Sequence, residues 1–504
     1  MSDPLRICFC ASEVVPYAKT GGLADVAGAL PRALAELGCD VRIVVPAYRA
    51  VDREKFGFRA IGQAEVALGD ARVPVRFFES RLPGSAVPVH LVANDRLFDR
   101  PGLYGEGGRD YPDNLERFSA FCRAALALLR HTGWPPHVLH CHDWQTALLP
   151  VYLRVEPRDP LLAATGTLFT IHNLAYQGLF PRERLRATGL GPRLFTPDGI
   201  EFYGQINLLK GGLIFADLLN TVSEQYAREI QTPEFGAGLD SLLRERAATL
   251  IGILNGVDYA AWDPSTDPLI PARYTPQDLA GKSVCKEQLQ RGLGLEAGAR
   301  IPLIGMITRL ADQKGLDLVS SAIETILGLG AQFALLGAGD PVYEARFQEI
   351  AKRYPGRAAA SLGFDEPLAH RIESGADMFL MPSRYEPSGL NQLYSLRYGT
   401  VPVVRRTGGL ADTIVDASPD ALARATANGF VFEPYAADAL LGAVARALVM
   451  FFHDAASWRR LQATGMRQDF SWGRSATKYV AAYQRVIAAA AAARRKTLSD
   501  EPST

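Results

Sequence analysis

Residues 301–336 have the sequence IPLIGMITRLADQKGLDLVSSAIETILGLGAQFALL, which contains one complete strand–helix–strand unit. The apolar run Ile301–Ile307 predicts a buried strand, Leu316–Leu327 has the apolar spacing of an amphipathic helix, and Phe333–Leu336 predicts the next strand. Strands joined through a helix in this way are the repeating unit of a doubly wound parallel sheet. The stretch therefore predicts that fold class for its half of the chain.

The same alternation continues along nearly the whole sequence. Further short apolar runs bounded by turn residues predict strands, and Leu390–Tyr398 predicts a helix. Pro402 lacks an N–H group, which favours an irregular or edge position for the last of these strands. We predict an α/β protein with two Rossmann-like, doubly wound parallel-sheet domains. The further predicted strands are Ile7–Cys10, Val41–Val45, Val138–Cys141, Leu168–Ile171, Met378–Met381 and Val401–Val404.

A stretch dense in Pro and Asp, WDPSTDP at residues 262–268, predicts the boundary between the two domains. The chain has 504 residues, enough for two large domains at about 150 or more residues each. We assign residues 1–262 to an N-terminal Rossmann-like domain and 263–480 to a C-terminal one. We assign residues 481–504 to a helical end and a polar tail. Beyond Val486 the chain is alanine-rich and then polar, which favours a frayed helix there.

The composition is that of an ordinary globular protein, with 48% hydrophobic and 21% charged residues. The 54 basic and 54 acidic residues cancel, so no global field attracts nucleic acid or an anionic membrane. The six cysteines contain no C-x-x-C pair, and neither a signal peptide nor a membrane-spanning apolar run is present. We therefore expect a cytoplasmic protein without nucleic-acid or membrane partners.

The hexapeptide TGGLAD occurs twice, at Thr20–Asp25 and Thr407–Asp412, and a basic residue precedes each copy, Lys19 and Arg406. Each copy follows a predicted strand or its loop and opens a helix. Backbone N–H groups and the helix dipole favour anions there, and glycine lets a ligand approach the backbone. The alternative is that these glycines only start helices. We expect the two loops, one from each half, to face each other across a single cleft.

Charged residues follow two strands of the second half. Arg309 and Lys314 lie in the loop after Ile307, and Glu386 lies in the loop after Met381. Ligands bind at the carboxyl ends of such strands, and both basic side chains suit phosphate oxygens. Solvated surface charges are the alternative for the basic pair. A carboxylate that favours the helix dipole is the alternative for Glu386.

Histidines lie at two strand ends of the first half. His140 and His142 share one strand face and Asp143 follows them, but this segment has too few partners for a metal, so we predict no metal site. His172, with Asn173, ends the strand Leu168–Ile171, where a ligand-facing role competes with a purely structural one.

These blocks together resemble the bacterial glycogen synthases and plant starch synthases. They occur in that family's order, and the resemblance extends from about Ile7 to Tyr483. It implies a GT-B fold and a retaining glycosyltransferase that moves glucose from ADP-glucose to the non-reducing end of an α-1,4-glucan in glycogen biosynthesis, without a cofactor. The blocks are Lys19–Asp25, His142–Trp144, His172–Gly178, Arg309–Gly315, Glu386–Leu390 and Thr407–Asp412.

The resemblance also implies roles for individual residues. It places Arg309 and Lys314 at the leaving diphosphate, Glu386 facing the donor sugar and His172 at the transferred glucose, as the catalytic set. Asp143 belongs to the acceptor side, and Phe364 lies against the adenine. Ser388 stands where the family usually has cysteine, and its hydroxyl can still donate to a sugar or phosphate oxygen. The substrate-binding set is Lys19, Gly21, Gly22, Asp143, Asn173, Phe364, Ser388, Gly389, Leu390, Thr407 and Gly408.

Two other functions fit the same fold class. A non-catalytic, two-lobed sugar or nucleotide binder would share the cleft, but it need not keep Arg309, Lys314 and Glu386 together. A nicotinamide-dependent oxidoreductase would share the sheets, yet the G-x-G-x-x-G fingerprint is absent and Gly337–Asp340 only begins like one. Failure to release ADP from ADP-glucose in the presence of glucan would favour the non-catalytic binder.

Overall fold

A computed structural model describes residues 3–157 and 159–499, and its contacts divide the chain into two compact units. Unit 1 runs to Val222 and includes Ala227–Gly256 and the chain from Trp472 onwards. Unit 2 comprises Ser223–Tyr226 and Val257–Ser471. The division therefore falls after Gly256 rather than after residue 262, and the chain returns to unit 1 before residue 480.

Within the described residues, unit 1 contains a nine-stranded sheet in the order β14-β13-β9-β8-β1-β2-β5-β4-β3. Its strands are parallel from β14 to β5, and β4 and β3 continue it as an antiparallel hairpin. The strands are β1 (Arg6–Cys10), β2 (Asp40–Pro46), β3 (Arg59–Leu68), β4 (Ala71–Arg81), β5 (Pro88–Ala93), β8 (Val138–His142), β9 (Gly166–Ile171), β13 (Leu218–Thr221) and β14 (Leu250–Gly252).

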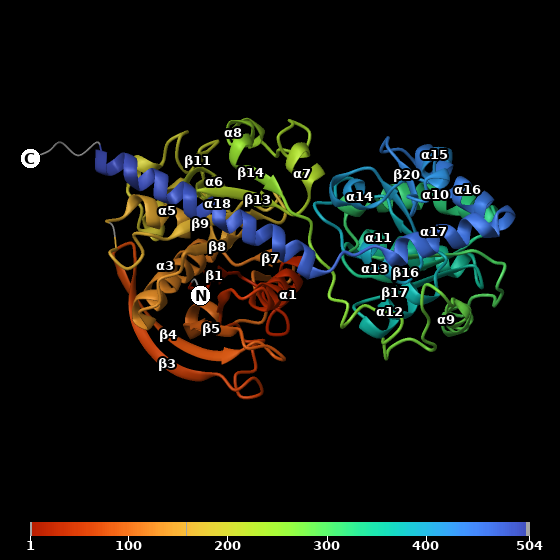
Figure 1. The fold of residues 1–504 in the computed structure, drawn as a ribbon, viewed down its shortest axis with the longest axis horizontal. Helices are drawn as coiled ribbons and strands as arrows, with labels where there is room; N and C mark the ends of the chain where they lie inside the picture. Colours follow the sequence, from red (N-terminus) through yellow and green to blue (C-terminus); the bar gives the residue numbers. More distant parts are fainter. Residues whose placement is uncertain (1–2, 158, 500–504) are drawn as a thin grey trace, which may run out of the picture. The chain divides into compact units, whose positions relative to one another are not determined.

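Helices cover both faces of this sheet (Figure 1). In β9 a Cβ atom on Gly166 would meet Val486 of α18. Phe169, three residues later in the same strand, packs on Gly212 of α6. Successive strand residues point to opposite faces, so α18 and α6 cover opposite sides of β9. The helices are α1 (Gly22–Glu36), α2 (Asp95–Phe98), α3 (Asn114–Thr132), α4 (Asp143–Thr146), α5 (Leu148–Val155), α6 (Leu208–Phe215), α8 (Asp240–Glu245) and α18 (Trp472–Ser499), with α7 (Glu224–Glu229) divided between the units.

Smaller elements complete unit 1. A three-stranded antiparallel sheet has the order β10-β12-β11, and a two-stranded one pairs β6 with β7. The segments are β6 (Gly105–Glu106), β7 (Arg109–Asp110), β10 (Leu179–Pro181), β11 (Glu201–Phe202) and β12 (Gln205–Asn207), with the 3-10 helices η1 (Arg182–Thr188), η2 (Pro192–Leu194) and η3 (Ala247–Thr249).

Unit 2 contains a six-stranded, all-parallel sheet in the order β17-β16-β15-β18-β19-β20. Ile304 and Met306 of β15 enter one apolar core, and Leu303 enters a second core on the other face. Burial of both faces explains why the strand sequences are almost continuously apolar. The strands are β15 (Leu303–Ile307), β16 (Gln332–Gly337), β17 (Ala358–Leu362), β18 (Met378–Met381), β19 (Val401–Arg405) and β20 (Phe430–Phe432).

The helices of unit 2 connect these strands as the predicted pattern requires. Leu316–Leu327 and Leu390–Tyr398 correspond to α10 and α13, so both predicted helices are confirmed. The helices are α9 (Ala280–Gly292), η4 (Asp312–Lys314), α10 (Leu316–Gly328), α11 (Pro341–Arg353), α12 (Glu366–Gly375), α13 (Asn391–Arg397), α14 (Gly408–Thr413), α15 (Pro419–Ala423), α16 (Ala437–His453) and α17 (Ala455–Arg467).

Every predicted strand is present, but the edge position inferred from Pro402 is wrong. Pro402 lies in β19, which pairs with β18 on one side and β20 on the other. The pairing with β20 begins only at Val403, so the missing N–H group of Pro402 costs no ladder hydrogen bond on that side. A proline is therefore accommodated inside the sheet without a bulge.

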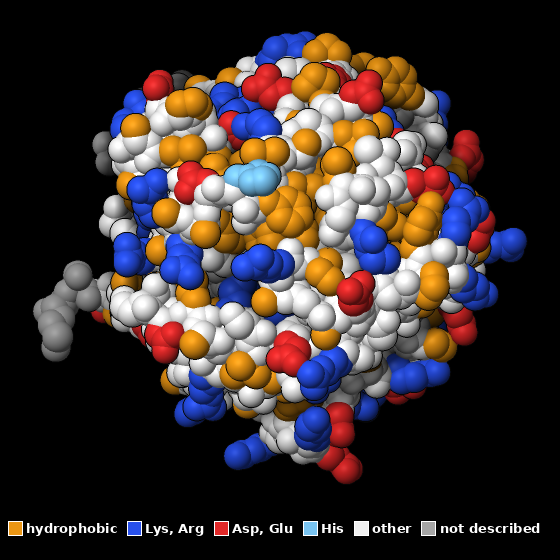
Figure 2. All heavy atoms as spheres, turned by 90° about the vertical axis from the view of Figure 1, so that its right-hand side faces the viewer, with side chains coloured by type: hydrophobic (Ala, Val, Ile, Leu, Met, Phe, Trp, Pro, Cys, Tyr) orange, Lys and Arg blue, Asp and Glu red, His pale blue; other side chains and the backbone are white. Residues whose placement is uncertain are grey.

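No single helix in the described part of the chain is long and apolar enough to cross a membrane. Among the described residues, only α16 and α17 taken together are both long and apolar enough, and they are bent by 115° where they join. On the face drawn in Figure 2, basic and acidic side chains are interspersed. That face therefore presents no extended field of one sign.

Candidate functional site

Both large sheets place the predicted site residues at the carboxyl ends of their parallel strands. In unit 2, β15 has β16 on one side and β18 on the other, so the strand order reverses between β15 and β18. Arg309 and Lys314 follow β15, and Glu386 follows β18. This reversal is where open α/β sheets bind ligands, because the two flanking loops part there.

The Glu386 carboxylate is buried, with 5% of the residue exposed, and three donated contacts hold it. Lys314 Nζ lies 2.7 Å from Oε2 and 3.0 Å from Oε1, and Ser383 Oγ donates to Oε2 over 2.8 Å. A buried carboxylate needs such partners to remain charged. The structure therefore brings together two of the predicted catalytic residues and adds Ser383, which the sequence analysis missed.

The loops after β15 and β18 are bonded to each other. Arg384 N–H donates to the Gln313 carbonyl, and Gln313 Nε2 donates to the Tyr385 carbonyl. Arg309 Nη2 contacts Gln313 Oε1 at 3.3 Å, which links the second basic residue to these two bonded loops. We call the two loops, with Arg309, Lys314 and Glu386, the assembly. A Cβ atom on Gly315 would lie 2.1 Å from the Pro382 carbonyl oxygen, so only glycine allows this approach.

The second TGG loop packs directly against the Glu386 loop. Gly409 N–H donates to the Glu386 carbonyl over 3.0 Å. Cβ atoms on Gly408 and Gly409 would lie 1.9 Å from the Glu386 oxygen and 1.8 Å from the Ser388 oxygen. Gly408 also has φ +44, a conformation that other residues rarely adopt. These two glycines therefore have a packing role within unit 2, and Gly409 uses its N–H group inside the protein.

The remaining predicted residues of unit 2 lie around this assembly. Ser388 is 7% exposed, and its Oγ is buried without a hydrogen-bond partner among the described residues. Gly389 and Leu390 continue the loop into α13, and Thr407 immediately precedes α14. Phe364 follows β17 and is 86% exposed, so its ring is accessible at the same sheet edge.

In unit 1 a buried carboxylate, Glu13, organises the first TGG loop. Its oxygens accept from Thr20 N–H and Thr20 Oγ1 at 2.5 Å, and from Gly21 N–H at 3.1 Å. Tyr104 Oη donates to the same carboxylate over 2.6 Å. The N–H groups of Thr20 and Gly21 are therefore bonded to Glu13 in this structure. Glu13 already neutralises this end of α1.

The glycines of the first copy nevertheless have no packing role. A Cβ atom on Gly21 or Gly22 would have nothing within 4 Å, and both residues are exposed. Lys19, before the loop, forms an exposed ion pair with Asp25 at 2.7 Å. Identical sequences thus have different surroundings, because the copy at residues 407–409 is packed and the copy at 20–22 is open.

Asp143 and His172 meet at the carboxyl ends of β8 and β9. His172 N–H donates to Asp143 Oδ1 over 2.7 Å. Burial raises the pKa of Asp143 to about 7, although N–H groups of His172 and Asn173 oppose the shift. Asp143 has φ +55, an unusual conformation for a residue other than glycine. The Asn173 side chain accepts from Ala175 N–H over 3.1 Å, which shapes the loop after His172.

The His172 ring is neutral near pH 7, because burial lowers its pKa to about 3. Its Nε2 lies 2.9 Å from Nδ1 of His142, and burial lowers the pKa of His142 as well. One ring must donate and the other accept, so this contact couples the proton positions of the two neutral rings. The contact joins residues 30 positions apart and was not predicted.

His140 belongs to a structural network rather than to a metal site. Its Nδ1 lies 2.9 Å from Tyr483 Oη and its Nε2 lies 2.6 Å from Thr170 Oγ1. The chain described here, 3–157 and 159–499, contains no group of three or more His, Cys, Asp or Glu side chains arranged to hold a metal ion. The network instead attaches α18 to the sheet of unit 1.

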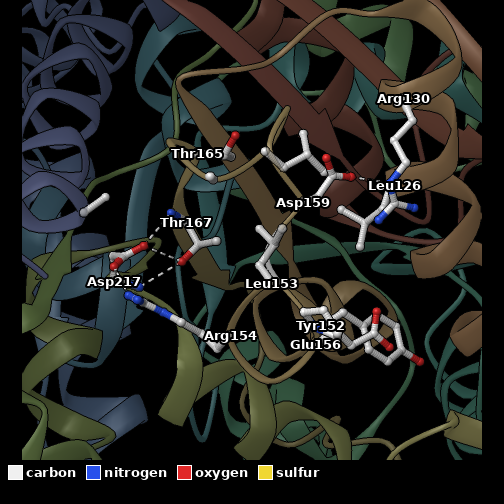
Figure 3. A pocket seen from close by; sticks show the side chains of 14 residues that line it. Leu126, Arg130, Tyr152, Leu153, Arg154, Glu156, Asp159, Thr165, Thr167 and Asp217 are labelled. Carbon is white, nitrogen blue, oxygen red and sulfur yellow. Dashed lines mark hydrogen bonds and ion pairs between the residues drawn. The ribbon is translucent and has the colours of Figure 1, made fainter. Parts of the chain in front are cut away.

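A small cavity of about 90 Å³ lies at the opposite edge of the unit 1 sheet (Figure 3). Thr167 is the second residue of β9 and Asp217 precedes β13, so this cavity lies at the amino ends of those strands. Arg154 pairs with Asp217, and Arg130 pairs with Asp159. The cavity contains none of the predicted site residues, and ion pairs join these basic side chains to acidic ones.

Sequence patterns alone could have suggested Glu13 but not Ser383. Glu13 follows the predicted strand Ile7–Cys10 and precedes the glycine loop, which is a ligand-side position. Ser383 has only its own strand-end position as a signal, and serine is common in such loops. Chemically, unit 2 offers cations and a fixed carboxylate, and unit 1 offers a neutral imidazole and a buried acid.

Two protein-family models match the chain. The model described as the starch synthase catalytic domain matches residues 6–245, and the model described as glycosyl transferases group 1 matches residues 297–450. A glycogen synthase of Anaeromyxobacter dehalogenans (strain 2CP-C) is 54% identical over 482 residues, covering 95% of this chain and 99% of that protein. Glycogen synthase 1 of Methylococcus capsulatus (strain Bath) is 48% identical over 493 residues, covering 96% and 97%.

Solved structures show the same similarity. The catalytic domain of starch synthase IV from Arabidopsis thaliana, bound to ADP and acarbose, superimposes with a TM-score of 0.89 at 37% identity, covering 96% of this chain and 100% of that one. Sucrose-phosphate synthase from Thermosynechococcus elongatus gives a TM-score of 0.59 at 19% identity, with coverage of 96% and 100%. The second similarity concerns the fold alone.

Proposed function

The chain belongs to the family of bacterial glycogen synthases and plant starch synthases, and we propose from this premise that it transfers glucose from ADP-glucose to the non-reducing end of an α-1,4-glucan, with retention of configuration. It is a glycosyltransferase of the GT-B fold, with a Rossmann-like parallel sheet in each unit. The observation that carries the proposal is the Lys314–Glu386–Ser383 cluster at the strand reversal of unit 2.

Arg309 and Lys314 act on the leaving diphosphate. Breaking the anomeric bond of a sugar nucleotide places negative charge on the diphosphate, and fixed cations stabilise that charge in the transition state. Lys314 is already held at 2.7 Å from Glu386, so it is positioned before a donor binds. Three N–H donors on its ammonium group allow it to keep Glu386 while it contacts a phosphate oxygen.

Unit 1 supplies groups for the sugar and the acceptor. His172 is neutral at pH 7, so it hydrogen-bonds a hydroxyl of the transferred glucose and adds no charge. Asp143 has a pKa near neutrality, which suits a group that exchanges a proton with an acceptor hydroxyl. We assign no covalent nucleophile, and we treat Glu386, whose oxygens contact Lys314 and Ser383, as a fixed carboxylate that faces the donor sugar.

The test of this function is the release of nucleoside diphosphate. The purified chain is incubated with ADP-glucose or UDP-glucose, with and without glycogen, and ADP or UDP is measured. Glycogen-dependent ADP release supports the proposal. Donor cleavage that is equally fast without glycogen, or no cleavage at all, contradicts it and favours a hydrolase or a non-catalytic binder.

We expect ADP-glucose to be preferred over UDP-glucose in kcat/KM. The exposed ring of Phe364 suits stacking on a purine, which presents a larger aromatic surface than uracil. Steady-state assays with both donors at saturating glycogen measure the ratio. Replacing Phe364 with Ser is expected to reduce the preference. Equal efficiency of the two donors in the unmodified chain would contradict the assignment of adenine.

We expect transfer to continue in excess EDTA. Enzymes that use Mg²⁺ hold the ion with closely spaced carboxylates, and the ion then bridges phosphate oxygens. Here Arg309 and Lys314 are placed for the same neutralisation. Activity is measured before and after thorough chelation at constant ionic strength. Loss of activity that Mg²⁺ or Mn²⁺ restores would show that the two basic residues are not sufficient.

A further inference from the structure

An unusual turn joins β11 to β12 in the small sheet of unit 1. Tyr203 and Gly204 form this two-residue turn, and their φ angles are +49 and +81. Both angles are positive, as in a type I′ hairpin turn, where asparagine, aspartate and glycine are the favoured residues. A tyrosine at the first position is unfavourable for the backbone, and such residues concentrate at functional positions.

The Tyr203 ring contributes little to the packing of the fold. The residue is 83% exposed, and its ring contacts Phe202 edge-on, with the ring centroids 4.7 Å apart. An asparagine would relieve the backbone and would expose less apolar surface. Neither folding nor solubility therefore explains the aromatic side chain at this position.

The turn is connected to the loop that follows His172. Gln177 Nε2 donates to the Ala237 carbonyl over 3.0 Å, and Asn207 Nδ2 donates to Gln177 Oε1 over 2.6 Å. A Cβ atom on Gly238, beside Ala237, would contact the Phe202 ring at 2.9 Å and the Tyr203 ring at 3.6 Å. A continuous set of contacts thus joins Tyr203 to the segment that carries His172.

Two more exposed apolar side chains lie in the segment that leads into the same small sheet. Tyr176 is 50% exposed and Leu179, the first residue of β10, is 45% exposed. Leu179 lies opposite Asn207 on β12, and Phe202, next to Tyr203, lies opposite Gln205, so Leu179 and Phe202 are two positions, or about 7 Å, apart along β12. We call Tyr176, Leu179 and Tyr203 the aromatic row.

We propose that the aromatic row binds glucose units of the acceptor chain away from the reacting end, with Tyr203 stacked on a pyranose face. This inference rests on the proposed function and adds an acceptor subsite to it. Pyranose rings present C–H groups on their faces and hydroxyls at their rims. Separate aromatic rings between polar residues such as Glu201 and Gln205 match that alternation, whereas a protein partner requires a larger continuous apolar core.

Two substitutions separate the ring from the backbone. Tyr203→Asn removes the ring and relieves the positive φ, whereas Tyr203→Trp keeps an aromatic face. For Tyr203→Asn we expect the KM for glycogen to rise about fivefold or more, with kcat and the KM for ADP-glucose unchanged and the melting temperature not lowered. Tyr203→Trp is expected to retain the KM of the unmodified chain. Phe452→Ser, at an exposed position of unit 2, is the control.

Binding without a donor gives an independent readout. Affinity electrophoresis in gels containing glycogen is expected to show weaker retention of Tyr203→Asn than of the unmodified chain and of Tyr203→Trp. If all variants are retained equally and share one KM for glycogen, the subsite is wrong while the proposed function stands. If the unmodified chain transfers no glucose to glycogen, the proposed function fails and this inference fails with it.

Discussion

Replacing Lys314 with alanine is expected to lower kcat by on the order of 100-fold or more, the scale for removing one preorganised group that stabilises developing charge. Lys314 Nζ lies within 3.0 Å of both Glu386 oxygens, so the substitution removes a phosphate-neutralising cation and loosens the carboxylate. Arg309→Ala is expected to lower kcat to a similar extent. In this variant the loss comes only from the missing contact with the diphosphate. Glycogen-dependent ADP release at saturating substrates measures both effects.

The control must separate chemistry from folding. Removing Lys314 takes two contacts from the buried Glu386 carboxylate and leaves it the Ser383 hydroxyl, which destabilises the loop. Circular dichroism and the melting temperature therefore accompany the kinetics, and Lys352→Ala, at an exposed position of α11, serves as the matched lysine control. A folded Lys314→Ala chain with nearly normal kcat would remove this residue from the leaving-group role.

The parallel sheets were predictable because both of their faces are buried. Such strands are nearly continuous apolar runs, and the predicted Met378–Met381 coincides with β18. Prediction was poorest where polar residues form strands. β9 begins at Gly166, two residues before the predicted Leu168, and the antiparallel hairpin β3–β4 alternates exposed and buried residues. The hairpin has no apolar run to reveal it.

The return of the chain to unit 1 could not be predicted from local pattern. Residues 481–504 were expected to form a helical end and a polar tail, frayed beyond Val486; Tyr483 and Val486 of α18 are buried, and so is Ala490 within the expected frayed part. Tyr483 bonds to His140, 343 positions away in sequence. Contacts at that separation leave no periodic signal, because each partner alone is consistent with an ordinary helix or strand. Residues 500–504 lie outside the described part of the chain.

In the candidate site, too, some residues were predictable from their position after a strand, and others only from their contacts in the folded chain. Arg309, Lys314 and Glu386 were found because each follows a strand directly, and parallel strands bring their carboxyl ends together. Glu13 has a ligand-side position after a predicted strand, but only its contacts with Thr20 and Gly21 show that it holds the glycine loop. Ser383 was missed because its importance lies in its contact with Glu386.

The repeated TGG loop provides a matched pair of substitutions with opposite expected outcomes. A Cβ atom on Gly409 would lie 1.8 Å from the Ser388 oxygen, so Gly409→Ala must displace the backbone that carries Glu386. Overpacking of this kind destabilises by about 1–3 kcal/mol, and each kcal/mol lowers the melting temperature by about 2–4 °C in a unit of this size. Gly409→Ala is therefore expected to melt earlier and to lose most of its kcat.

Gly22→Ala is expected to do the reverse. A Cβ atom there meets nothing within 4 Å, and alanine is favoured over glycine in a helix, so the melting temperature should not fall. The added methyl group occupies space that the open loop leaves for a ligand, so the KM for ADP-glucose should rise severalfold.

Gly442→Ala in α16, also without neighbours within 4 Å, is the control for adding a methyl group to a helix. The melting temperature and the KM for ADP-glucose are measured for the three variants and compared with those of the unmodified chain. A Gly22→Ala chain with an unchanged KM would show that the open copy does not serve donor binding, and a stable, active Gly409→Ala chain would show that the packed copy does not position Glu386.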